Sequence, residues 1–171
     1  LRSAWRDGSW DVFVGQYFTR WNREVHVCQP FNIPKHWKRY RSIDYGTASA
    51  SAVYWWAQDE NGKSYAYREL YEANMTYEQL AKRIKEMTPE SEQIDYTVVD
   101  PSICNKREQR GSQFVTGAEI LGNNGVYVRA GDNSRIEGWR RVQSLLEMQK
   151  ICFFSNCLRA IETIPTMVHD T

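Results

Sequence analysis

Two stretches decide the fold: Arg41-Ser42-Ile43-Asp44-Tyr45-Gly46 and Tyr96-Thr97-Val98-Val99-Asp100-Pro101-Ser102. Each is a short run suited to a buried strand, and each ends in a carboxylate that a chain-turning residue follows. Gly46 provides the turn after the first run and Pro101 the turn after the second. If the two strands are parallel neighbours, both carboxylates lie at one edge of a sheet, about 4.8 Å apart in strand spacing.

Asp44 and Asp100 are therefore the candidate catalytic and metal-binding residues. Two carboxylates at this spacing suit divalent cations held roughly 3.5–4 Å apart for phosphoryl chemistry. Each aspartate alone has a structural explanation, since Asp before Gly or Pro commonly forms a turn. Their joint placement at strand ends favours metal ligation. His26, His36 and His169 have no ligand spacing, so a histidine metal site is not expected.

The composition predicts a folded protein without bulk affinity for nucleic acid. The length of 171 residues predicts one domain, with room for a fragment of a second. A hydrophobic fraction of 42% and seven Trp are enough for a core, while the net charge is only +1. Any DNA-binding surface must therefore come from local clusters of Arg and Lys. The four Cys form no Cys-x-x-Cys pair, which favours reduced thiols. Without a signal peptide or a long apolar run, we expect a soluble protein in a reducing compartment.

Residues 1–40 do not resemble the start of a domain. They are crowded with aromatic side chains, show little periodicity and are interrupted by Pro30 and Pro34. Two interpretations stay open: an arm that lies across the following domain, or the tail of a preceding domain.

From Arg41 the pattern becomes regular and predicts a three-stranded meander. Its strands are expected at Arg41–Tyr45, Ser49–Gln58 and Ser64–Tyr71, with Asn61-Gly62 as a hairpin turn between the last two. In the third strand, Tyr65, Tyr67 and Tyr71 are expected on one face.

The rest of the chain predicts alternating helices and strands, which gives an α/β fold with a mixed sheet and helices on both faces. Thr76-x-x-Gln79 and Ser134-x-x-Glu137 are expected capping boxes, each opening a helix. The other expected segments are a strand at Tyr96–Asp100, a polar loop at residues 102–113, a short helix at Thr116–Leu121, and then a strand at Val126–Arg129, a strand at Ile151–Phe154 and a helix at Leu158–Thr163.

Two phosphate-binding patterns compete with the metal hypothesis. Ala57-x-x-x-x-Gly62-Lys63-Ser64 matches a loosened phosphate loop, but the glycine lies in the expected hairpin and a strand follows it. Asp44-Tyr45-Gly46-Thr47 fits the phosphate-gripping turn of actin-like ATPases. Those folds need a Gly-Gly near the adenosine, and this chain has none.

Six cations are candidate DNA-binding residues. Three follow the second acid and three lie around the second capped helix, where a helix N-terminus beside Arg is a good phosphate grip. An ordinary solvated face is the alternative for each of them. Gly138 costs that helix stability, which suggests that nucleic acid approaches closely there. The six are Lys106, Arg107, Arg110, Arg135, Arg140 and Arg141.

The ordered set of motifs resembles the C-terminal nuclease domain of tailed-phage terminase large subunits, a ribonuclease H-like fold. The matching pieces span nearly the whole chain: Gly8-Ser9-Trp10-Asp11-x-Phe13-x-Gly15-Gln16-x-Phe18, Pro34-x-x-Trp37, Arg41-x-Ile43-Asp44-Tyr45-Gly46, Tyr67-Arg68-Glu69-Leu70-Tyr71, Asp100-Pro101-Ser102, Asn133-x-Arg135-x-x-Gly138-Trp139 with Leu145-Leu146, Phe153-Phe154-x-x-Cys157 and Glu162-Thr163-Ile164-Pro165.

The resemblance implies a metal-dependent endonuclease that cuts double-stranded DNA concatemers. Asp44 would bridge two Mg²⁺ or Mn²⁺ ions and Asp100 would bind one of them. It also implies that residues 1–40 lead from a packaging ATPase domain of the same full-length chain and that the nuclease domain covers residues 41–171. The implied partners are double-stranded DNA, the terminase small subunit and the portal protein, with no membrane, in the cytoplasm of the host cell.

One element of the family is missing from the sequence. The family carries a third acid in an Asp-His-x-x-Asp-type helix near the domain end, which nothing here matches. We expect it beyond Thr171, and this chain alone is then expected to be weakly active or inactive. Another ribonuclease H-like nuclease of resolvase or integrase type, and a catalytically silent packaging module, are the alternatives.

Overall fold

The computed structural model describes residues 15–132 and 134–169, with the backbone alone at residues 135 and 136. The strands are β1 (Val27–Cys28), β2 (Lys38–Asp44), β3 (Ala50–Gln58), β4 (Ser64–Ala73), β5 (Tyr96–Val99), β6 (Arg107–Arg110), β7 (Gln113–Thr116), β8 (Arg129–Ala130) and β9 (Ile151–Phe154). The helices are α2 (Arg23–His26), α3 (Tyr77–Met87), α4 (Pro101–Asn105), α5 (Gly117–Asn123), α6 (Arg135–Glu147), α7 (Leu158–Thr163) and the 3₁₀ turn η1 (Ile164–Thr166). None of these helices is long and apolar enough to cross a lipid bilayer.

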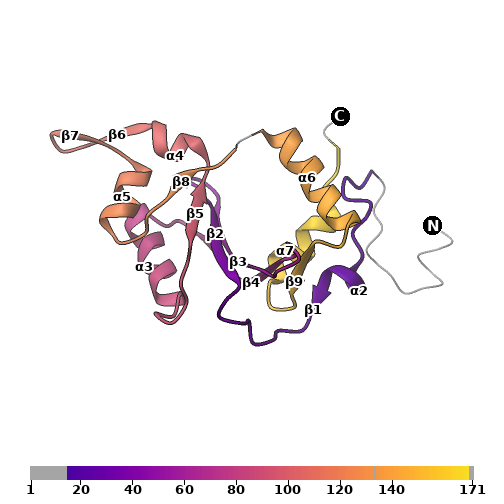
Figure 1. Cartoon of the computed structure of the whole chain (residues 1–171). Coiled ribbons are helices and arrows are strands. Elements are labelled where there is room, and N and C mark those ends of the chain that lie inside the picture. The colour runs from indigo at the N-terminus through magenta and orange to yellow at the C-terminus, as the bar shows by residue number, and fades with distance from the viewer. Residues whose placement is uncertain (1–14, 133, 170–171) are drawn as a thin grey trace.

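A seven-stranded mixed sheet organises the molecule, in the order β1-β9-β4-β3-β2-β5-β8. The meander β2-β3-β4 is antiparallel, whereas β5, β8, β9 and β1 each join the sheet by parallel pairing. A separate hairpin, β6-β7, extends from the body (Figure 1). The predicted α/β class with a meander followed by parallel strands is therefore confirmed.

The sheet separates two hydrophobic cores, so helices cover both faces as predicted (Figure 1). Leu80 and Ile84 of α3 and Leu121 of α5 pack on one face with Val53 and Trp55 of β3. The second core includes the following residues of α6, β9, α7 and the N-terminal segment: Leu146, Phe153, Ile161, Phe18 and Trp21.

Local chemistry explains the elements that the sequence predicts well. Asp59 accepts hydrogen bonds from the backbone N–H groups of Asn61 and Lys63, and Gly62 has a positive φ of 79°, which closes the β3-β4 hairpin. The loosened phosphate-loop match thus lies in a hairpin. Thr76 and Gln79 form the expected capping box that opens α3.

The segment expected as a polar loop at residues 102–113 is instead α4 followed by most of the β6-β7 hairpin. Pro101 occupies the first turn of α4, where its missing N–H costs nothing, and Ile103 is buried. Gly111, with a φ of 62°, provides the hairpin turn. The loop prediction was wrong because polar side chains in exposed strands give no apolar alternation.

Two further local predictions are corrected. The Ser134 side chain makes no capping hydrogen bond, so the second capping box is absent from α6. The strand expected at Val126–Arg129 is reduced to β8. The backbone N–H of Val126 donates to the Leu121 carbonyl at 2.8 Å, which keeps this part of the chain in the C-terminal turn of α5.

The segment from Gln16 to Cys28 packs on the same sheet as the rest of the chain. β1 pairs with β9, and Phe18 is buried beneath α6. The buried His26 accepts from the backbone N–H of Asn22 at Nδ1, so its Nε2–H donates to the Leu146 carbonyl at 2.8 Å. Most of the predicted junction motif that starts at Gly8 lies outside the described residues. The assignment of residues 1–40 to the tail of another domain stays a prediction.

Candidate metal centre and DNA-binding face

Asp44 and Asp100 end two neighbouring parallel strands. β2 and β5 pair in parallel, and their last paired residues are Ile43 and Val99. The residue that follows in each strand direction is an aspartate, and both aspartates are exposed. Because in-register neighbours point to the same side of a sheet, the two carboxylates belong to one face and one edge.

The two carboxylates have different surroundings. Asp100 is the N-cap of α4, and its Oδ1 accepts the backbone N–H of Ser102 at 2.8 Å. The hydrogen bonds from Ser102 hold the pKa of Asp100 below its usual range, so this group is an anion at neutral pH. Asp44 lies before the tight turn at Gly46, whose N–H donates to Ser51 Oγ.

The described residues contain no cluster of three or more His, Cys, Asp or Glu side chains that could hold a metal ion. Asp44 and Asp100 are therefore a pair without a third acidic neighbour among those residues. Carboxylate oxygens are the ligands that Mg²⁺ and Mn²⁺ prefer, so the donor chemistry fits a divalent cation.

The face that carries the acids also carries a row of stacked rings. The rings of Tyr96, Tyr40 and Trp56, on β5, β2 and β3, stack at centroid distances of 5.2 Å and 6.1 Å. Trp56 Nε1 donates to Ser42 Oγ at 3.0 Å, which fixes the indole against β2. Arg129 of β8 continues the row, with its guanidinium carbon 3.9 Å from the centroid of the Tyr96 ring. Sequence reasoning missed Arg129, although it ends an apolar run before Gly131 much as the two acids end theirs.

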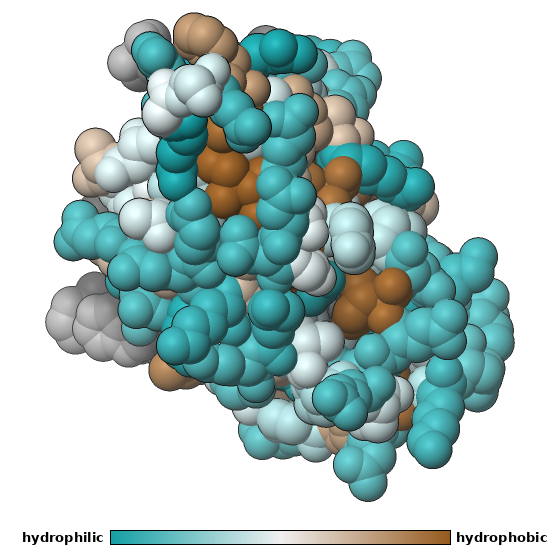
Figure 2. Space-filling view, turned by 90° about the vertical axis from the view of Figure 1, so that its left-hand side faces the viewer, coloured by the Kyte–Doolittle hydropathy of each residue, from teal (hydrophilic) through white to brown (hydrophobic). Residues whose placement is uncertain are grey.

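The first group of predicted DNA-binding cations lies on and beside the β6-β7 hairpin. Lys106 and Arg107 are exposed. Arg110 is partly neutralised, because its guanidinium lies 2.5 Å from Glu78 and 2.8 Å from Glu108. Figure 2 views the molecule from the hairpin side, where the surface is mostly hydrophilic with small separate hydrophobic patches. Such a surface suits a charged or polar partner.

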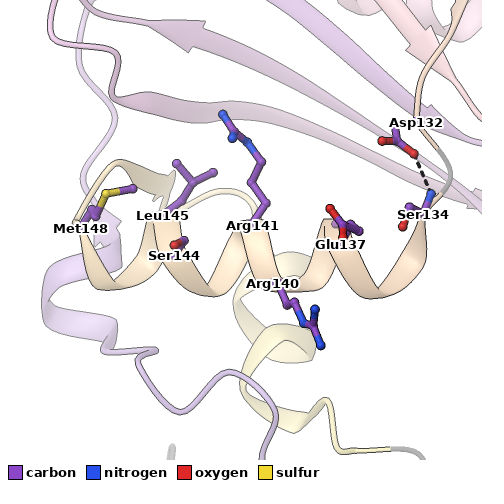
Figure 3. Close-up of a pocket in the computed structure, with 9 residues that line it drawn as sticks. Asp132, Ser134, Glu137, Arg140, Arg141, Ser144, Leu145 and Met148 are labelled. Atoms are coloured by element: carbon purple, nitrogen blue, oxygen red, sulfur yellow. Dashed lines mark hydrogen bonds between the residues drawn. The ribbon is translucent and has the colours of Figure 1, made fainter.

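The second group lies on α6, which flanks the sheet on the side opposite α4 and the hairpin (Figure 1). The exposed Arg140 and Arg141 line a groove of about 470 Å³ with Asp132 and Glu137. Figure 3 shows Arg140 and Arg141 pointing to different sides of the helix. The side chain of the predicted Arg135 lies outside the described residues. The acids and the two cation groups are thus on different elements around one end of the sheet.

Replacing Gly138 by alanine is expected to raise the free energy of unfolding by about 0.5–1 kcal/mol, because glycine is a poor helix former. A Cβ at this position would meet no protein atom within 4 Å. We also expect duplex DNA affinity to fall, since the glycine leaves room for a close approach. Urea denaturation and fluorescence anisotropy measure the two effects, with Ser144→Ala on the same helix as the control. A variant that gains stability and keeps its DNA affinity would exclude a close approach of DNA here.

Comparisons with known proteins identify the fold. No family model and no curated protein matches the sequence. Among solved structures, the P22 large terminase nuclease domain superposes with a TM-score of 0.73 at 18% identity, covering 91% of this chain and 80% of that one. The chain has the fold of a large-terminase nuclease domain, which is ribonuclease H-like.

Two other solved structures extend this result. The large terminase from a thermophilic bacteriophage gives a TM-score of 0.75 at 21% identity, covering 91% of this chain. This chain spans only 38% of that longer protein. The large-terminase nuclease domain of bacteriophage SPP1, with bound Mn, gives a TM-score of 0.57 at 12% identity, covering 85% of this chain and 79% of that one.

Proposed function

We propose that this chain is the metal-dependent endonuclease domain of a phage DNA-packaging terminase large subunit, acting on double-stranded DNA. One observation carries the proposal: parallel pairing of β2 and β5 brings Asp44 and Asp100 to one sheet edge in a fold shared with large-terminase nuclease domains. The Mn in the SPP1 domain supports a divalent cation as the cofactor.

In this proposal Asp44 bridges two Mg²⁺ or Mn²⁺ ions and Asp100 binds one of them. Divalent cations bound there would lower the pKa of a water for in-line attack and stabilise the leaving oxygen. The hydrogen bond from Ser102 keeps Asp100 ionised and aims its carboxylate. Lys106, Arg107, Arg140 and Arg141 hold the DNA backbone largely without sequence choice.

The wider setting is proposed on the same basis. The nuclease domain would follow a packaging ATPase domain in the full-length chain and act with the small subunit and the portal protein in the cytoplasm of the infected cell. The third acidic ligand is expected beyond Thr171.

Metal-dependent stabilisation and cleavage test the proposal together. We expect Mn²⁺ to raise the melting temperature, because a ligand that binds only the folded state stabilises it by mass action. Supercoiled plasmid should be nicked only with Mn²⁺ or Mg²⁺, and EDTA should abolish both effects. A chain that is neither stabilised nor activated by these cations would contradict the nuclease proposal.

A catalytically silent packaging module is the second candidate. It is favoured by the lack of a three-ligand acidic cluster among the described residues. The same titration separates the two candidates, because a silent module binds DNA without any Mn²⁺-dependent change in melting temperature.

A further inference from the structure

Arg129 is an exposed cation on the same sheet face as Asp44 and Asp100. β8 pairs with β5 so that Arg129 lies beside Val98, and Asp100 follows two residues after Val98. Residues in register share a face, so Arg129 projects to the acid side of the sheet. From strand geometry, the Cα atoms of Arg129 and Asp100 are about 8 Å apart, combining one strand spacing with two residues of rise.

The guanidinium of Arg129 is held in place and carries no carboxylate. Its carbon lies 3.9 Å from the centroid of the Tyr96 ring, and Tyr96 stacks on Tyr40 with an interplanar angle of 9°. The Tyr40 hydroxyl in turn donates to Ser64 Oγ at 3.1 Å. Within the described residues, no Asp or Glu forms an ion pair with Arg129, in contrast to Arg110 with its two glutamates.

A guanidinium over an aromatic ring is suited to a phosphate. The ring contacts the flat face of the cation, whereas the N–H donors lie in its plane and stay available for phosphate oxygens. The contact also limits the freedom of a long side chain, so less entropy is lost when a ligand binds. DNA carries one charge per about 1.7 Å of duplex axis, so a phosphate at the acids has neighbours within reach of Arg129.

We propose that Arg129, held over Tyr96, binds the DNA backbone beside the phosphate that reaches Asp44 and Asp100, and thereby positions the strand for cleavage. The inference rests on the proposed nuclease function. It adds a DNA contact on the sheet itself, between the hairpin cations and those of α6.

The test measures binding of a short fluorescent duplex without metal, for Arg129→Gln, Arg129→Lys and Tyr96→Leu. We expect Arg129→Gln to raise Kd about five- to tenfold and to reduce the slope of log Kd against log salt by about 1. Arg129→Lys restores the salt slope but only part of the affinity, because lysine keeps the charge and loses the planar fork. Tyr96→Leu keeps the charge and raises Kd by a smaller factor.

Arg23→Gln is the matched control. Arg23 is an exposed arginine on α2, beside β1 at the far end of the sheet order from β8. Its loss should leave Kd and the salt slope unchanged. In cleavage assays Arg129→Gln should raise KM more than it lowers kcat, and the Mn²⁺-dependent shift in melting temperature should stay at the wild-type value.

The outcomes separate this inference from the nuclease proposal. An Arg129→Gln protein with wild-type Kd and salt slope overturns the inference, even if Asp44→Asn abolishes cleavage. A wild-type chain that neither binds nor cleaves DNA overturns both. If Arg129→Gln weakens DNA binding while Mn²⁺ has no effect on the wild type, the Arg129 contact stands and the nuclease proposal fails.

Discussion

Replacing Asp44 by asparagine is expected to lower the rate of Mn²⁺-dependent plasmid nicking by about 10³-fold or more. Asparagine keeps the size of the side chain, so the turn at Gly46 is retained. What is lost is the anionic oxygen that would bridge two cations, and cations at such a site contribute several kcal/mol of transition-state stabilisation. At about 1.36 kcal/mol per factor of ten, a rate loss of this size follows.

Asp95→Asn is the matched control, because Asp95 precedes β5 at the end opposite Asp100. It is exposed, and its Oδ2 accepts the backbone N–H of Arg39 at 3.0 Å, a role that asparagine can keep. Asp95→Asn should therefore cleave like the wild type, whereas Asp44→Asn should lose cleavage and much of the Mn²⁺-dependent shift in melting temperature. Equal nicking by the Asp44→Asn protein and the wild type would refute the assigned role.

The sequence is informative about the acid pair because both acids are defined locally. A short apolar run, an aspartate and a turn residue are adjacent in the chain, and the parallel pairing of β2 with β5 then brings the two ends together. The hairpin at Asn61-Gly62 and the capping box of Thr76 with Gln79 are predictable for the same reason. In each case the residues that fix the structure are close neighbours in the chain.

The β-bulge in β4 shows where local reasoning fails. Alternation predicts Tyr65, Tyr67 and Tyr71 on one face, but the register of β3 with β4 shifts between Trp55 and Trp56. Tyr65 and Tyr67 consequently pack on the α3 side, whereas Tyr71 lies on the other face, where the guanidinium of Arg159 lies over its ring. An extra residue in one strand reverses the side-chain direction beyond it, and no residue type announces it.

Contacts between distant segments were equally beyond the sequence. Arg129 is far from Tyr96 in the chain, and only the pairing of β8 with β5 makes them neighbours. Glu69 accepts the backbone N–H groups of Arg159 and Ala160 at the start of α7, 90 and 91 positions away. Such contacts depend on strand order, which propensity and periodicity do not give.

Gly46→Ala is expected to lower the free energy of unfolding by about 2–3 kcal/mol, the range for overpacking a tight site. A Cβ at Gly46 would lie 2.5 Å from the carbonyl oxygen of Ser49 and 2.6 Å from that of Ala50. Both contacts are with backbone, so no side-chain rotation relieves them and the turn itself must shift. Because Asp44 lies two residues earlier, the same shift should displace its carboxylate and weaken the Mn²⁺-dependent rise in melting temperature.

Gly131→Ala provides the comparison, since Gly131 follows β8 at the same edge of the sheet. Its added Cβ would meet the Val99 carbonyl oxygen at 3.5 Å and Val98 Cβ at 3.7 Å, which are ordinary van der Waals contacts. Urea denaturation should therefore show a change within about 0.5 kcal/mol for Gly131→Ala, as expected for a substitution without a clash. If the two variants unfold at the same urea concentration, the close approach of Ser49 and Ala50 does not constrain the turn, and the position of Asp44 does not depend on glycine at residue 46.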